Sequence, residues 1–140
     1  VKKNKKIIKV FLNIEILLYK LFCMNISEEI KPVLKKIKAN KVKEAELDLL
    51  DIIKKNDQNY LALNLIGQIK MQNKNYKEAI NFFNKSLDLK KDSLDVMFNK
   101  GVALNLLGLF KEAEIILDEL SKLNTSHYEI FYNLPQYKKN

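Results

Sequence analysis

The sequence predicts an all-α protein built as a stack of antiparallel helix pairs, and three observations point to this fold class. The 140 residues are 47% hydrophobic and 30% charged, which is close to the composition of globular proteins. Only three glycines and two prolines interrupt the chain, too few for the many turns of a β-sandwich or barrel. The tripeptide Lys-Glu-Ala recurs at Lys43, Lys77 and Lys111, a constant spacing of 34 residues that is typical of a two-helix repeat.

Boundary signals place the helices in chain order. Asn25 with Glu28 forms a capping box before the first helix, and Ser126 with Glu129 forms another before the last. Asn40, residues 73–75 and Gly108 are turn-forming positions that end the first helix of each pair. We therefore expect helices at residues 27–39, 43–55, 59–72, 76–89, 94–107, 110–123 and 127–134.

Small residues inside the predicted helices indicate where neighbouring helices approach closely. Ala79 precedes Phe83 by four residues, so both lie on one face of the helix. Gly67 and Gly101 lie in the middle of first helices, where glycine is less favourable than alanine by about 1 kcal/mol, which implies a packing reason for them. Pro32 is expected to delay or kink the first helix, because proline removes a backbone hydrogen bond.

This 34-residue pattern resembles the tetratricopeptide repeat over about residues 26–134. The matching positions are Val42, Ala45 and Leu49 in the first repeat, Leu63, Ile66, Gly67, Tyr76, Ala79 and Phe83 in the second, and Met97, Gly101, Leu104, Phe110, Ala113 and Leu117 in the third. Departures are Glu29, Pro32 and Val33 in the first repeat, Lys70 and Lys91 in the second, and Lys100 and Thr125 in the third. The resemblance implies a right-handed superhelical solenoid with repeats at 26–59, 60–93 and 94–127, a partial fourth at 128–140, and a separate N-terminal segment at 1–25.

Composition argues against most catalytic, metal and cofactor chemistry. Cys23 and His127 are the only residues of their types, so neither a disulfide within the chain nor a histidine or cysteine metal cluster is expected. No glycine-rich phosphate-binding loop is present, and Glu44, Glu78 and Glu112 recur as charges at helix starts. All 25 basic residues are lysines, which lack the planar fork that arginine uses to read bases. The sequence therefore predicts a protein that is not an enzyme, with no cofactor, no metal and no specific nucleic-acid partner.

The predicted function is that of an adaptor, because helical-repeat solenoids present an extended concave surface for protein binding. Residues of the first helices that lie off the packing positions line this groove, where amides can bond a partner's backbone and aromatic rings add contact area. The predicted groove residues are Asn64, Gln68, Met71, Asp95, Phe98, Asn99, Val102, Asn105, Tyr132 and Asn133. The resemblance implies that asparagines at the positions of Asn99 and Asn133 contact the backbone of a bound peptide.

Two other functions remain open at this point. The chain is alternatively a fragment or accessory module of a larger enzyme with such repeats, which the incomplete fourth repeat suggests. The second alternative is a self-associating scaffold, since an uncapped end of a solenoid can stack on another copy. In the family, some members hold a C-terminal carboxylate with lysines and an arginine, but Leu61, Asn64, Leu65, Asp95 and Asn99 occupy those positions here, so no such clamp is expected.

The N-terminal segment combines a basic start with an apolar run. Residues 7–23 are strongly apolar but contain Lys9, Glu15 and Lys20, which disfavours a clean transmembrane span. Four interpretations stay open: an amphipathic helix at a membrane surface, a signal anchor, a helix that packs on the first repeat, and an untranslated extension before Met24. The expected location is the cytoplasm, and membrane association through residues 1–23 is one of these open alternatives.

Overall fold

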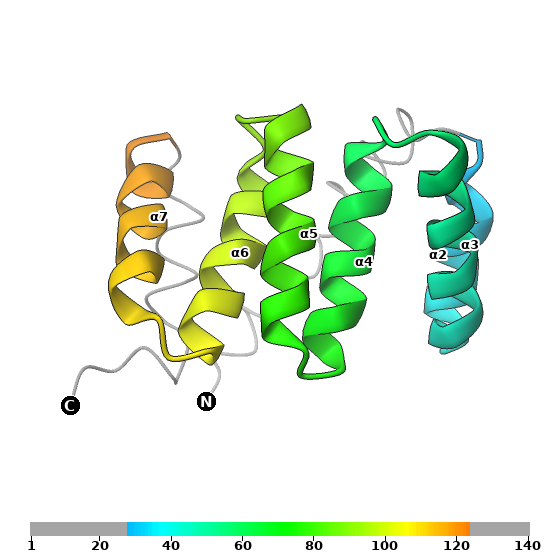
Figure 1. Ribbon diagram of the computed structural model, residues 1–140, viewed down its shortest axis with the longest axis horizontal. Coiled ribbons are helices and arrows are strands. Elements are labelled where there is room, and N and C mark those ends of the chain that lie inside the picture. Colours follow the sequence, from blue (N-terminus) through cyan, green and yellow to red (C-terminus); the bar gives the residue numbers. More distant parts are fainter. Residues whose placement is uncertain (1–27, 124–140) are drawn as a thin grey trace, which may run out of the picture. The chain divides into compact units, whose positions relative to one another are not determined.

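The computed structural model describes residues 28–123, and within this range it contains six α-helices and no strands (Figure 1). The helices are α2 (Ile30–Lys38), α3 (Val42–Lys55), α4 (Tyr60–Gln72), α5 (Tyr76–Leu89), α6 (Leu94–Leu106) and α7 (Phe110–Leu123). Five of the predicted helices agree with these bounds to within one residue, and the first begins three residues later than predicted. The helix predicted at 127–134 lies outside the described residues, as do Asn25, Ser126 and Glu129.

The chain divides into two compact units, residues 1–41 and 42–140. Helix α2 belongs to the first unit and buries Ile30 and Val33. It begins at Ile30 with Glu29 at its N-cap, so Pro32 lies in the first turn. Backbone N–H groups in a first turn have no partner within the helix, and proline is therefore tolerated there. Helix α2 starts later than residue 27, in agreement with the delay predicted from Pro32.

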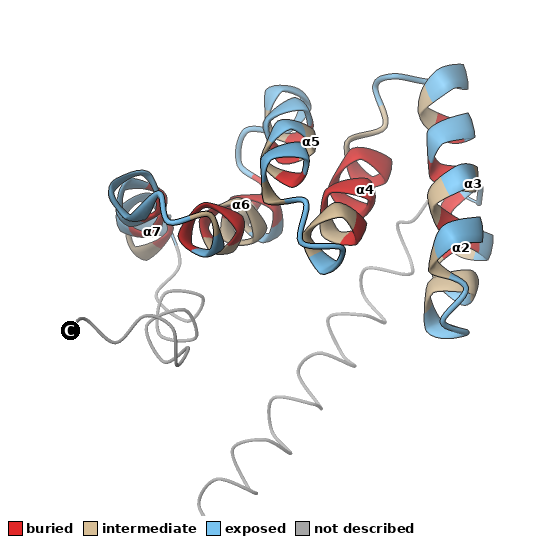
Figure 2. Ribbon diagram, turned by 60° about the horizontal axis from the view of Figure 1, so that its bottom comes forward, coloured by how far each residue is buried: buried red, intermediate tan, exposed pale blue. Residues whose placement is uncertain are grey.

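Helices α3 to α7 form the second unit, in which each helix packs against the next one in the chain. Helices α4 and α6, the first helices of the second and third repeats, also contact each other. Helix α4 is buried over most of its surface, whereas α5 and α7 keep one face exposed to solvent (Figure 2). This arrangement confirms the predicted stack of helix pairs and brings the two first helices side by side.

The turn within each repeat has the same backbone geometry, with one residue in the left-handed region. These residues are Asn40, Lys74 and Gly108, at φ of 59°, 62° and 85°, and they follow one another at intervals of 34 positions. The amide of the next residue donates to a carbonyl five positions earlier in each case, as in Lys41 to Lys36, Asn75 to Lys70 and Leu109 to Leu104, all with N···O distances of 2.9 Å. This is a Schellman ending, which satisfies carbonyls at a helix C-terminus. The predicted turn positions are therefore confirmed.

The close approach expected at Gly67 is present between α4 and α5. A Cβ atom added at Gly67 would lie 2.5 Å from Cε1 of Phe83, whose ring is completely buried. Phe83 belongs to a cluster with Ala79 of α5 and with Val96 and Ala103 of α6. The absence of a side chain at Gly67 thus lets the aromatic ring fill the space between two helices.

Candidate functional site

The first helices of the second and third repeats are joined by a hydrogen bond between two predicted groove residues. The side-chain Nδ2 of Asn99 on α6 donates to Oδ1 of Asn64 on α4 over 3.1 Å. Asn64 is only 5% exposed and Asn99 is half-buried. The two amides therefore hold each other in fixed positions across the repeat boundary, which lowers the entropy lost when a ligand orders them.

Four half-buried side chains accompany this pair on the same two helices. Gln68 and Met71 lie on α4 one and two turns beyond Asn64, and Phe98 and Val102 lie on α6. Phe98 and Val102 pack in part against the core between α6 and α7, while Met71 packs against the cluster around Phe83. Each of these apolar side chains is thus supported from behind and retains a partly exposed surface.

The remaining predicted groove residues lie in different environments. Asn105 on α6 is 7% exposed, and within residues 28–123 its side-chain amide has no hydrogen-bond partner. Asp95 is exposed near the start of α6. Tyr132 and Asn133 lie outside the described residues. We refer to Asn64, Gln68 and Met71 of α4 together with Phe98, Asn99, Val102 and Asn105 of α6 as the first-helix surface.

Few charges occur on the two helices that carry the first-helix surface. Lys70 is the only charged residue of α4, and α6 contains only Asp95 and Lys100. The second helices differ sharply, since α3 alone contains seven charged residues. A ligand on the first-helix surface would therefore meet amides and apolar groups rather than a charged patch.

Lys70 makes a bridge that the sequence did not predict. Its Nζ lies 3.0 Å from Oε1 of Glu46 on α3 and 2.9 Å from Oε2 of Glu78 on α5. The hydrogen bonds to Glu78 and then to Glu46 raise the pKa of the lysine above its ordinary value of 10.5. The side chains of Lys70 and Glu46 are only 22% and 21% exposed. The repeat that the sequence resembles has an aromatic residue at this position, and here ion pairs link three consecutive helices instead.

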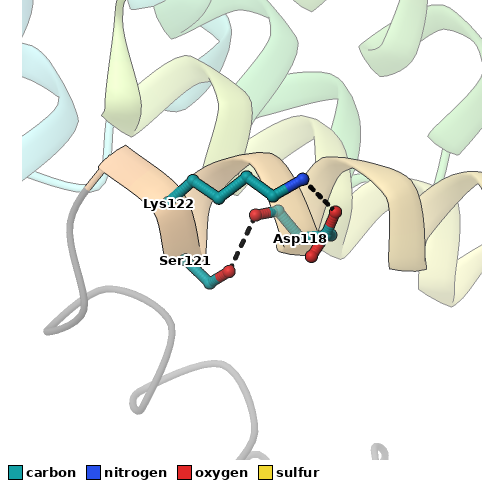
Figure 3. A network of polar contacts seen from close by, with 3 residues as sticks. All are labelled: Asp118, Ser121 and Lys122. Carbon is teal, nitrogen blue, oxygen red and sulfur yellow. Dashed lines mark hydrogen bonds and ion pairs between the residues drawn. The ribbon is translucent and has the colours of Figure 1, made fainter.

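Two further polar contacts were not predicted: no local pattern marks the first, whereas the second includes an ion pair four residues apart on one helix, a spacing that is visible in the sequence. The hydroxyl of Ser86 on α5 is completely buried and donates to the carbonyl of Tyr60 on α4 over 2.7 Å. At the end of α7, Asp118 accepts hydrogen bonds from Lys122 through its carboxylate and from Ser121 through its carbonyl, both over 2.7 Å (Figure 3). The Lys122 pair is exposed to solvent and lies within one helix, so it differs from the bridge at Lys70 in burial and reach.

Within the described residues, no three or more histidine, cysteine, aspartate or glutamate side chains are grouped so as to hold a metal ion. None of the helices from α2 to α7 has the length and apolar character needed to span a membrane.

Comparisons with known proteins agree with this architecture. Residues 70–132 match the tetratricopeptide repeat family model. A solved structure of MamA MSR-1 C2 superposes with a TM-score of 0.60 at 22% sequence identity, and the match covers 76% of this chain and 69% of that one. No curated protein sequence matches this chain. The match over residues 70–132 agrees with the predicted repeat family, and the predicted all-α fold of stacked helix pairs is confirmed.

Proposed function

We propose that this chain, whose residues 70–132 match the tetratricopeptide repeat family model, is an adaptor that binds a peptide or helical segment of another protein on its first-helix surface. A general role in protein interaction follows from the family, whose members are generally non-catalytic scaffolds. The location of the binding site on α4 and α6 is the specific part of the proposal.

The observation that carries this proposal is the hydrogen bond between Asn99 and Asn64. It fixes two amides from successive repeats at the boundary between α4 and α6. An amide can both donate to and accept from a peptide backbone, and amides held in place by neighbours lose less entropy on binding. The buried amide of Asn105, which lacks a partner within the described residues, adds unused hydrogen-bonding capacity on the same helix.

The supporting apolar groups suit a partner that carries its own apolar side chains. Met71, Phe98 and Val102 offer partly exposed surface beside the amides. A segment that alternates apolar anchors with backbone contacts would use both kinds of group. We propose that Gln68, Met71, Phe98, Asn99 and Val102 contact the partner directly, with Asp95 at the edge and Asn64 and Asn105 behind them. Tyr132 and Asn133 stay predicted contacts.

To test the proposal, peptides that bind the full chain are first selected from a displayed random library. Their affinities are then measured for the parent protein and for two variants. The variant Gln68→Ala with Asn99→Ala removes two half-buried amides of the first-helix surface without opening the core. The matched control, Asn81→Ala with Asn84→Ala, removes two exposed amides from the outer face of α5. Circular dichroism verifies that both variants keep the helicity of the parent.

We expect the affinity of selected peptides, measured by fluorescence polarisation, to fall at least about tenfold in the first-helix variant, which corresponds to about 1.4 kcal/mol. The control should remain within about twofold of the parent. Equal losses in both variants, or no loss in either, would overturn the proposed site. Self-association and membership of a larger enzyme stay alternative predictions, which light scattering of the full chain and the length of the native protein would address.

A further inference from the structure

One face of α6 differs in chemistry from the equivalent face of α4. Three positions on this face, each four residues from the next, have amide side chains on α4 and apolar side chains on α6. The aligned pairs are Asn64 with Phe98, Gln68 with Val102, and Gln72 with Leu106. Residues four apart lie one above the other on a helix, so each set forms a row along its helix axis. We call the three residues of α4 the amide row and the three of α6 the apolar row.

The apolar row keeps accessible surface over its whole length. Phe98 and Val102 are half-buried and pack in part against the core between α6 and α7, and Leu106, the last residue of α6, is 40% exposed. The row extends over eight residues of helix, about 12 Å. In the second repeat an exposed glutamine, Gln72, holds the position of Leu106, so the repeat architecture does not require an apolar residue there.

A partner helix fits the apolar row better than an extended segment does. An extended segment would lose hydration of its backbone N–H and C=O groups against this row, and its three side chains offer no hydrogen bond in return. A helix pairs its backbone groups internally and presents only side chains along its length. Its apolar residues at i, i+4 and i+7 form a stripe with the same rise per turn as the apolar row.

The charge on this face favours a basic residue at one end of the partner. Asp95 is exposed on α6, three residues before Phe98, and it is the only acidic residue of α4 and α6. Lys70 of α4 is already paired with carboxylates of α3 and α5. A lysine or arginine one turn before the first apolar residue of a partner helix would therefore meet the Asp95 carboxylate.

We infer that the partner segment is an amphipathic helix that packs lengthwise on the apolar row of α6, with a basic residue beside Asp95. Its polar side faces the amide row, where Gln68 and Gln72 bond polar side chains of the helix or unpaired backbone groups at its end. The inference rests on the proposed function, because it names the kind of segment that the first-helix surface binds. It adds Leu106 to the contacts expected on that surface.

The probe is a displayed library of helical peptides of about 15 residues, a length at which an alanine-rich helix can form in water. Apolar residues are fixed at i, i+4 and i+7, and the flanking positions are randomised. A matched library keeps these three residues and adds a central proline, which breaks the helix. Both libraries are selected against the full chain.

The test variant, Leu106→Gln, gives the third repeat the residue that the second repeat has at this position. The control, Leu50→Gln, makes the same change on α3, where Leu50 is 43% exposed and thus closely matches Leu106. Circular dichroism verifies that both variants keep the helicity of the parent. A third variant, Asp95→Asn, removes the carboxylate without changing the size of the side chain.

We expect binders from the helical library and none from the proline library. Their affinity, measured by fluorescence polarisation, should fall about tenfold in Leu106→Gln and less than about twofold in Leu50→Gln. Asp95→Asn should weaken these binders about threefold at low salt and leave their affinity unchanged at about 1 M salt, where the charge is screened.

The absence of helical binders, equal enrichment of both libraries, or equal effects of the two leucine variants would overturn the inference. An affinity that Asp95→Asn leaves unchanged at low salt would overturn the basic residue beside Asp95. The proposed function is judged separately, by the random library and the variant Gln68→Ala with Asn99→Ala. Random-library peptides that lose affinity in that variant but bind equally well with a central proline would support the proposed function and reject a helical partner.

Discussion

At the scale of single residues, Gly67 shows how one missing side chain organises the packing of two helices. Helix propensity alone favours alanine over glycine in the middle of α4 by about 1 kcal/mol. The ring of Phe83 occupies the place that a Cβ atom would take, with a separation of 2.5 Å, and it is completely buried. The close packing of α4 and α5 therefore outweighs the propensity of glycine.

We predict that Gly67→Ala lowers the free energy of unfolding by about 1–3 kcal/mol. Overpacking of the filled core destabilises the fold by more than the higher helix propensity of alanine stabilises it. Urea unfolding followed by circular dichroism measures the change. In the double variant Gly67→Ala with Phe83→Leu, the smaller side chain makes room for the new methyl group, so the two losses should be less than additive. A Gly67→Ala variant as stable as the parent would show that the ring is not held in place.

Gly67 and Asn99 show which packing contacts the sequence can predict and which it cannot. Gly67 could be predicted as a packing position because glycine is costly in a helix and recurs in the repeat frame. The hydrogen-bond partner of Asn99 could not be predicted. The 34-residue repeat aligns Asn64 with Phe98, whereas the hydrogen bond joins Asn64 to Asn99, 35 residues away. Which of two adjacent side chains meets a neighbouring repeat depends on the rotation between helices, and a spacing in sequence does not contain that rotation.

At the scale of helices, the boundaries were largely predictable because asparagine and glycine at turn positions act locally. The turns at Asn40, Lys74 and Gly108 share one hydrogen-bond pattern although their residues differ. The bridge at Lys70 was not predictable in the same way. Its two partners lie 24 residues before it and eight residues after it, on different helices. The sequence shows that Lys70 replaces the usual aromatic residue. Only the packed structure shows that Glu46 and Glu78 pair with this lysine.

We predict that Lys70→Met lowers the free energy of unfolding by about 1–2 kcal/mol, since the poorly exposed carboxylate of Glu46 loses a charged hydrogen-bond partner. The control Lys122→Met removes the exposed pair with Asp118 within α7, which solvent screens, so its loss of stability should be clearly smaller. Parallel urea titrations of both variants compare the two losses. Equal losses would contradict a special role for the bridge between helices.

The difference in unfolding free energy between the parent protein and Lys70→Met should depend on pH, because the pKa of Lys70 is raised. A lysine whose folded-state pKa lies above its unfolded value of 10.5 stabilises the fold fully below that value. The stabilisation disappears as the pH rises through the folded-state pKa. The stability gap between the parent and Lys70→Met should therefore be constant between pH 7 and 9 and should shrink above about pH 10.5. A gap that persists unchanged well above that value would exclude an electrostatic origin.

At the scale of the whole molecule, stability in a repeat array is a sum of contributions from each helix pair and from its neighbours. Within the second unit, α4 contacts α3, α5 and α6, and its residues 61–67 are all buried. Helix α7 contacts α6 among the described helices and exposes Ile115 and Leu123 on its outer side. Opening α7 therefore disrupts fewer buried contacts than opening α4.

We predict that hydrogen exchange is slowest in α4 and faster in α7, with protection factors that differ by at least about tenfold, because local opening follows the buried contact of each element. Mass spectrometry of peptides covering the two helices at neutral pH gives this comparison directly. The Gly67→Ala variant serves as an internal check, since it strains the contact between α4 and α5 and should raise exchange in α4 more than in α7. Uniform protection across both helices would mean that the unit opens only as a whole, and the nearest-neighbour account of its stability would then be wrong.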